Sequence, residues 1–263
     1  MRLHRIHAIL LQEYFITKRS MEVSMDVFFF SMMNVTVFGY VSLFLSNIIG
    51  TSARHYIFLG VLLWEIIRVA QYSMSVGALW NIWSRNLSNM FITPLSIFEY
   101  LFTHMLSGAV KAFVVFAGVS FIASVVFDFH IVTLLGWTNL VVFFLNLLIF
   151  AWTTGIAILG LIFRFGNRIQ AFAWALVALF QPLTATLFPV SVLPPTLQRF
   201  TFLFPPTYVF EAARAALSDS SVNWNVTLVA FSLNLFYFFL ALWFFAAMYR
   251  ISRTNGQFAR NEG

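Results

Sequence analysis

The sequence predicts an all-α, polytopic membrane protein. Of its 263 residues, 61% are hydrophobic and 9% are charged, whereas soluble domains carry roughly 25% charged residues. The apolar residues form long runs, and a helix crosses a bilayer with about 20 residues. A transmembrane barrel needs short alternating strands, and the run 140–150 does not alternate. We expect one transmembrane domain over 1–263, with six spans at about 27–49, 56–79, 101–127, 138–163, 169–188 and 226–249.

The N-terminal segment predicts a helix that lies in the membrane interface. Its apolar stretch is short, is broken by Gln12 and Glu13, and is followed by no small-residue cleavage site, so a signal peptide is not expected. Apolar side chains recur at helical spacing along one face. We therefore expect an amphipathic interfacial helix over 1–22, with this apolar stripe: Leu3, Ile6, Leu10 and Tyr14.

The positive charges predict the orientation of the chain. With the N-terminus inside, ten cations fall on the cytoplasmic side and three outside, which is the positive-inside asymmetry. Basic residues near both termini require an even number of spans, and 250–263 is expected to be a cytoplasmic tail. Orientation and anionic headgroups explain the net charge of +6 better than nucleic acid does. The ten cytoplasmic cations are Arg2, Arg5, Lys18, Arg19, Arg85, Arg164, Arg168, Arg250, Arg253 and Arg260.

The external region 189–225 is long and still apolar. Six of the seven prolines lie between 182 and 206, and proline breaks a helix interior, so no single span covers this stretch. Broken helices are tolerated at membrane depth where protein shelters their backbone. We predict two short re-entrant helices, the second starting near Pro205-Pro206 and running through Glu211 and Arg214. The alternative is a helix-rich external loop packed on the bundle.

Two charges, Glu65 and Arg68, lie in the middle of the second span on one helix face. Together they cost about 5–7 kcal/mol of insertion free energy at mid-bilayer, whereas the apolar residues of the span contribute only about 3–7 kcal/mol in favour of insertion. This helix should therefore face protein or water rather than lipid, and Lys111 in the third span is expected to face inward as well. The pair either lines a translocation path or only fixes helix packing, and both interpretations stay open.

The sequence lacks the residue patterns of a membrane enzyme. There is no cysteine and no G-x-x-x-x-G-K-[ST] phosphate loop. The five histidines are scattered, and no two carboxylates share a span as an acid/base pair or a metal site would require. We expect no catalysis, no cofactor and no metal in this chain.

A polar stretch, "SNMFITPLSIFEYLFTHML" over 88–106, interrupts the apolar sequence on the cytoplasmic side. Thr93-Pro94 is a helix-start signal, and Ser96 and Glu99 have capping-box spacing. A short helix here, continuous with the third span, would let a soluble partner grip and move that span.

Two motifs resemble the permease subunits of the ABC-2 type transporter family. The stretch "NMFITPLSIFEYLFTHMLSG" is similar to that family's "TPLS-x-x-EYL" loop, and "FPVSVLPPTLQRFTFLFPPTYVFEAAR" to its external signature. The resemblance covers nearly the whole chain. It implies a type V ABC exporter: two six-span subunits, with a homodimer the simpler arrangement, and two copies of a separate ATPase that binds ATP and Mg²⁺.

The resemblance also implies which residues serve these roles. The ATPase would grip a coupling helix next to the interfacial helix, and the external helices would form an outer gate. The coupling helix comprises Thr93, Pro94, Leu95, Ser96, Phe98, Glu99 and Tyr100. The candidate path or gate comprises Glu65, Arg68, Pro194, Pro195, Pro205, Pro206, Tyr208, Glu211 and Arg214.

We therefore expect a subunit of an ATP-driven exporter in a prokaryotic cytoplasmic membrane. Its substrate would be a lipid-linked glycan, a lipid or an amphipathic drug-like molecule. The first span lacks the arginine-rich entry and tryptophan-proline start of the polysaccharide-exporting branch, so the substrate stays open, as does the choice between homodimer and heterodimer. The alternative is a passive channel or an assembly scaffold without a motor.

Overall fold

The computed structural model describes residues 2–218 and 221–256, and every regular element in these ranges is a helix. Five helical segments are long and apolar enough to cross a membrane: Met21–Ile48, Arg54–Trp83, Ile97–Phe127, Ile131–Ile169 and Trp224–Thr254. The all-helical, membrane-spanning class is therefore confirmed. These segments contain α3 (Phe30–Ile49), α4 (Thr51–Trp83), α6 (Ile97–Phe127), α7 (Ile131–Phe165) and α11 (Trp224–Thr254).

The helix α4 is the centre of the bundle. It packs against α3, α6, α7 and the short helix α8 (Phe172–Leu183). In its apolar stretch 89% of the residues are buried, against 28% for α6 and 22% for α11. The helix that carries both Glu65 and Arg68 thus faces protein, as its charges predicted. The outer helices instead expose large apolar side chains, such as Tyr40, Phe113 and Phe239, which acyl chains can cover.

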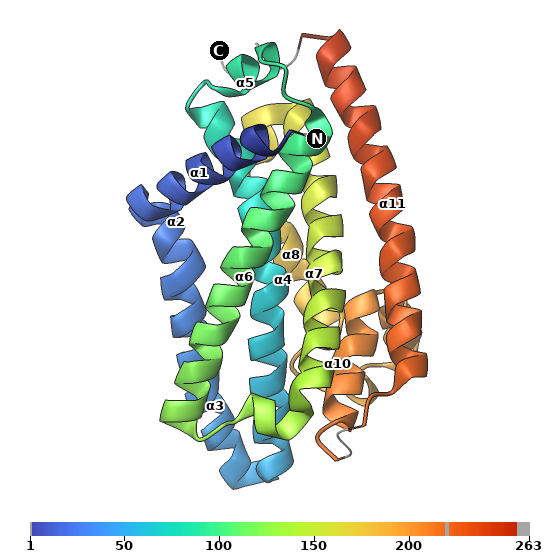
Figure 1. Cartoon of the computed structure of the whole chain (residues 1–263). Coiled ribbons are helices and arrows are strands. Elements are labelled where there is room, and N and C mark those ends of the chain that lie inside the picture. The colour runs from blue at the N-terminus through green and yellow to red at the C-terminus, as the bar shows by residue number, and fades with distance from the viewer. Residues whose placement is uncertain (1, 219–220, 257–263) are drawn as a thin grey trace.

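The start of α1 (Leu3–Arg19) and the end of α11 lie at one end of the bundle, together with the short helix α5 (Leu87–Ile92) (Figure 1). The long helices run between this end and the opposite end, where α3 meets α4 and where α10 (Pro205–Ala215) lies against the start of α11 (Figure 1). The predicted tail begins inside a helix, because α11 continues to Thr254. Residues 257–263 of that tail lie outside the described residues.

The predicted fifth span at 169–188 is not a single crossing helix. The chain forms a 3-10 turn over Gly166–Ile169, then α8 with twelve residues, and leaves the helix after Leu183. Twelve residues rise about 18 Å, less than the roughly 30 Å of a hydrocarbon core. The prediction was wrong here because apolar content does not reveal where a helix stops. Pro182 in the last turn and Ala185 at φ 51° mark that stop.

The segment after α8 reaches the centre of the bundle because α4 has a glycine at the point of contact. A Cβ atom on Gly60 of α4 would overlap the backbone carbonyl of Thr186. Only glycine permits this approach of backbone to helix. The chain directly after α8 is consequently packed on α4, where Thr184 and Thr186 are fully buried.

The N-terminal helix α1 (Leu3–Arg19) is confirmed as a helix, and the residues of its predicted apolar stripe are divided between the bundle and the outside. Ile6, Ile9 and Glu13 are buried, whereas Leu3 and Tyr14 are exposed. The Glu13 carboxylate, which is not part of that stripe, docks on α6. The exposed stripe stays free for lipid. The helix also ends before the predicted residue 22, since Ser20 is extended and α2 (Met21–Ser24) starts the first span.

Candidate functional site

The start of α6 carries the predicted capping box. The Ser96 hydroxyl accepts a hydrogen bond from the Phe98 backbone N–H (3.3 Å), and the Glu99 carboxylate accepts one from the Ser96 N–H (3.0 Å). The helix, however, begins at Ile97, so Pro94 is not in its first turn. The separate short helix in this region is α5, which ends before Thr93.

This arrangement corrects the predicted coupling helix over 93–100. Thr93, Pro94 and Leu95 form a turn in which the Leu95 N–H donates to the Thr93 carbonyl (2.7 Å). Pro94 disfavours a helical conformation in the residue before it, and extended Ser96 then caps a new helix. Phe98, Glu99 and Tyr100 are therefore the first turn of the spanning helix itself.

Glu99 faces α1 rather than solvent. Its carboxylate accepts a hydrogen bond from the Arg2 backbone N–H (2.8 Å) and lies 3.5 Å from the Arg5 guanidinium, and only 3% of the residue is exposed. Arg5 also donates to the Pro94 carbonyl. Within 92–98, the exposed residues are Ile92, Thr93, Pro94, Ser96 and Phe98.

The helix α5 ties the same end to three further helices through one ring. The Phe91 ring centroid lies 5.7 Å from that of Tyr100 in α6, 6.0 Å from Phe163 in α7 and 5.8 Å from Tyr249 in α11. Tyr100, predicted as a coupling residue, is fully buried in this cluster. A force applied to the turn at 93–95 would thus reach several spans at once.

A buried charged cluster that sequence reasoning did not find fastens α1 to the bundle. The Glu13 carboxylate lies 2.9 Å from the Lys111 ammonium and 3.6 Å from the His104 ring, both on α6. On α4, a Cβ on Gly77 would stand 3.0 Å from the Glu13 carboxylate and 2.8 Å from His104, so this helix leaves room for the cluster. The spacing 104, 107, 111 on one face of α6 was the available signal, because Ser107 also reaches Glu13 (3.4 Å).

Replacing Glu13 with glutamine is expected to loosen α1. The change leaves Lys111 without its carboxylate, and a hydrogen bond to a charged group contributes about 1.5–3 kcal/mol, so amide exchange of α1 should become about 10- to 100-fold faster. Hydrogen exchange in nanodiscs measures this. Glu22→Gln, on an exposed carboxylate of the adjoining α2, should leave the rate unchanged. Equal exchange in both variants would contradict the fastening role.

The same cluster predicts the pH range over which α1 stays docked. Burial alone would raise the pKa of Glu13, but the neighbouring Lys111 ammonium and His104 hold it below its ordinary value of 4.5. A lowered folded pKa gives stability that is present above 4.5 and lost as the pH falls through the folded value. Docking of α1 should therefore be the same at pH 7 and pH 5.5.

The pair Glu65–Arg68 joins α4 to the first span. The two side chains lie 2.8 Å apart, Asn34 donates to the Glu65 carboxylate (2.8 Å), and Arg68 donates to the Asp26 carbonyl (3.0 Å) and to Ser31. Asp26 lies in a π-helical turn, Met25–Phe29, and accepts a hydrogen bond from Tyr72 (2.7 Å). These contacts favour a packing role, and the path interpretation stays a prediction.

Two short helices are present in the region 189–225, as predicted. Pro195 opens α9 (Pro195–Thr201) after Pro194, and Pro205-Pro206 opens α10, where proline is favoured in a first turn. Tyr208 is half-buried, with its ring 5.3 Å from that of Phe202. The helix α10 packs against α7, α11 and α4.

Glu211 and Arg214 hold the segment after α8 in place. The Arg214 guanidinium donates to the backbone carbonyls of Ala185, Thr186 (3.1 Å) and Phe188 (2.8 Å), and to Glu211 (2.9 Å). Glu211 in turn accepts a hydrogen bond from the Val190 N–H (2.9 Å). The external motif therefore forms a clamp, in which one buried arginine satisfies carbonyls that no helix pairs.

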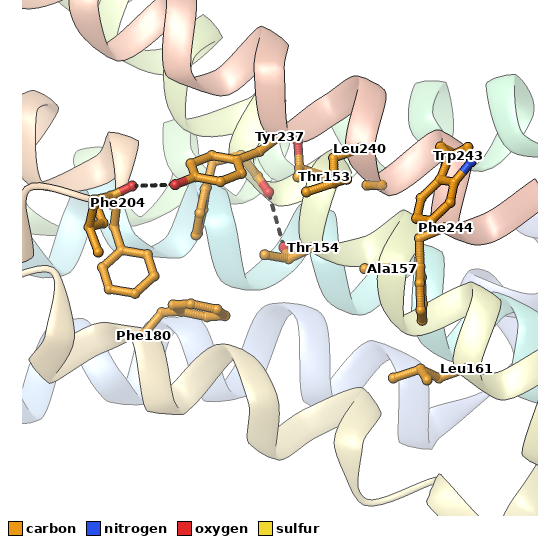
Figure 2. A pocket seen from close by; sticks show the side chains of 13 residues that line it. Thr153, Thr154, Ala157, Leu161, Phe180, Phe204, Tyr237, Leu240, Trp243 and Phe244 are labelled. Atoms are coloured by element: carbon orange, nitrogen blue, oxygen red, sulfur yellow. Dashed lines mark hydrogen bonds between the residues drawn. The ribbon is translucent and has the colours of Figure 1, made fainter. Parts of the chain in front are cut away.

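An apolar pocket of about 590 Å³ lies between α7, α8, α11 and the turn from α9 to α10. Figure 2 shows Phe180, Phe204 and Phe244 around it. Its hydroxyl groups are already engaged: Thr154 donates to the Phe150 carbonyl (3.0 Å) and Tyr237 to the Leu203 carbonyl (3.0 Å) (Figure 2). Such a pocket suits an apolar chain, since its hydroxyl donors are taken.

No group of three or more histidine, aspartate or glutamate side chains that could hold a metal ion occurs within 2–218 and 221–256. No family model matches this sequence, and no curated protein matches it.

Proposed function

We propose that this chain is the membrane subunit of an ATP-driven exporter of the ABC-2 type, working as a pair beneath which two copies of a separate ATPase bind. ATP and Mg²⁺ belong to that partner. The chain would reside in a prokaryotic cytoplasmic membrane with both termini inside, and the short α8 together with the segment after it would serve as the fifth of six crossings.

The observation that carries the proposal is the junction of α1, α5 and α6. Its outward residues are an apolar pair, Ile92 and Phe98, beside Pro94, and its buried residues are tied to the spans. Glu99 fastens the turn to α1, Glu13 fastens α1 to α6, and Phe91 fastens α5 to α7 and α11. A motor that pulls on the exposed side would move several spans together. The TPLS-x-x-EYL resemblance supports this use of the junction.

The substrate class follows from the membrane and the apolar pocket. A lipid-linked glycan, a lipid or an amphipathic drug-like molecule each has an apolar portion that the pocket of Figure 2 would accept. The pocket lies beside the turn that leads into α10, the helix we assign to the outer gate with Pro194, Pro195, Pro205, Pro206 and Tyr208. Closure of the ATPases would reorient the spans and open this gate.

The proposal is tested by purifying the tagged chain from its native membranes and measuring ATPase activity in nanodiscs. We expect a stoichiometric ATPase, and about tenfold or greater loss of its binding in Phe98→Ala, because exposed aromatic anchors dominate interfaces. Phe165→Ala, an exposed phenylalanine at the same end on α7, is the matched control. Glu99→Arg should release α1 and uncouple ATP hydrolysis from substrate.

The second candidate is a passive channel or scaffold, favoured by the dense α3–α4 network, which needs no motor. A chain that purifies alone, without nucleotide-dependent activity, would establish this candidate and remove the exporter.

A further inference from the structure

Besides the apolar pocket of Figure 2, the bundle has an apolar groove on its lipid-facing side. It lies away from the junction of α1, α5 and α6 and from the clamp formed by Glu211 and Arg214. It runs between α6 and the first half of α7 and has a volume of about 490 Å³. Phe113, Phe116 and Phe144 form its inner end, with the Phe144 ring about 6 Å from each of the other two. Phe113 is well exposed, so the groove opens sideways to the membrane.

The other end of this groove is polar. Ser124 and His130 are hydrogen-bonded (2.8 Å), and the far nitrogen of His130 lies 3.1 Å from the Asp128 carboxylate. His130 and Asp128 are exposed beyond the end of α6. Between the two ends, the Ser120 hydroxyl is buried in the wall without a hydrogen-bond partner in the described part of the chain.

The length of the groove matches one leaflet. From Phe113 to Ser124 the helix rises about 16 Å, roughly half of a 30 Å hydrocarbon core. Trp137, exposed at the polar end next to the non-helical Gly136 in α7, is of the type that marks a membrane–water interface. The groove is thus apolar at acyl-chain depth and polar at headgroup depth.

We propose that this groove is a binding site for a phospholipid of the leaflet at the α6–α7 end of the bundle. One acyl chain fills the space lined by the three phenylalanines. The Ser120 hydroxyl donates to an ester carbonyl, which gives this buried group the partner it otherwise lacks. The headgroup lies over His130 and Asp128. A helix of a second copy would fit the apolar end but would cover the exposed Asp128–His130 pair without pairing it.

This site is independent of the exporter proposal, and its test needs no ATPase. The delipidated full chain in detergent is titrated with palmitoyl-oleoyl-phosphatidylethanolamine, and bound lipids are counted by native mass spectrometry. Ala117→Phe narrows the groove from α6 and is expected to weaken one site by tenfold or more. Ser120→Ala, which keeps the shape, should weaken the same site about two- to tenfold through loss of one hydrogen bond.

Val114→Phe is the matched control, because Val114 is exposed on α6 near the same depth but does not line the groove. It should bind lipid as the unmodified chain does. If Ala117→Phe binds the phospholipid at this site as strongly as the unmodified chain does, the proposal is overturned. A change of oligomeric state in Ala117→Phe, with lipid binding unaltered, would also overturn it and assign the groove to a second copy.

Discussion

Replacing Arg68 with leucine is expected to destabilise the bundle by about 3–5 kcal/mol, the usual effect of removing one partner of a buried ion pair. Within the described residues, Glu65, which is fully buried, would keep only the Asn34 amide as a partner. The double variant Glu65→Leu/Arg68→Leu removes both charges and should recover most of the loss, because apolar replacements of buried pairs are often neutral. Reversible unfolding in mixed micelles measures both.

The same variants separate the two roles of the pair. Arg199→Leu, on an exposed arginine of α9, is the control and should change stability by less than about 0.5 kcal/mol. If the double variant is stable and transports normally, the pair only packs helices. If it is stable and transport is lost, the pair belongs to the translocation path. A fully stable Arg68→Leu single variant would contradict the network described here.

The second large effect is expected at Arg214. Arg214→Leu leaves the carbonyls of the segment 185–188 without their donor and removes the guanidinium partner of Glu211, which keeps its hydrogen bond from the Val190 N–H. Loss of a buried charged donor of this kind costs about 3–5 kcal/mol, concentrated in that segment and α10. We expect much faster amide exchange in 185–215 than in α4. In Arg214→Lys, the amide exchange rate of 185–215 should fall between the rates of the unmodified chain and of Arg214→Leu, because an ammonium group lacks the planar fork that reaches several carbonyls.

Arg199→Leu is again the control, since it removes an exposed arginine of α9, which lies between the segment 185–188 and α10. Unchanged exchange in Arg214→Leu would show that packing on α4 through Gly60, and not the clamp, holds the segment. A double variant with Glu211→Gln should add little to Arg214→Leu, because the two groups act together.

Much of the fold could be predicted from the sequence, because helix formation in lipid follows from local apolar content. The runs at 56–79, 101–127, 138–163 and 226–249 all became long helices, each several residues longer at one or both ends. The capping box at Ser96 and the start of α10 at Pro205 were predicted from neighbouring residues alone, because caps and prolines act within one turn.

The failures have a different physical origin. The end of α8 depends on Arg214, thirty-one residues beyond Leu183, which supplies donors to the carbonyls that follow the helix. The rotation of α1 depends on Lys111 and His104, nearly one hundred residues away. The predicted grip residue Glu99 proved to face α1, because Arg2 and Arg5 satisfy its carboxylate.

The sequence by itself determined the class of this protein, the number of long apolar helices to within one, and particular local signals such as the capping box at Ser96 and the start of α10 at Pro205. Those properties arise from composition and from interactions within a few residues. Only the tertiary structure decided which side chains meet: the Glu13 cluster, the Arg214 clamp and the polar end of the α6–α7 groove. Buried polar groups must find partners, and in a bundle those partners come from helices far away in the chain.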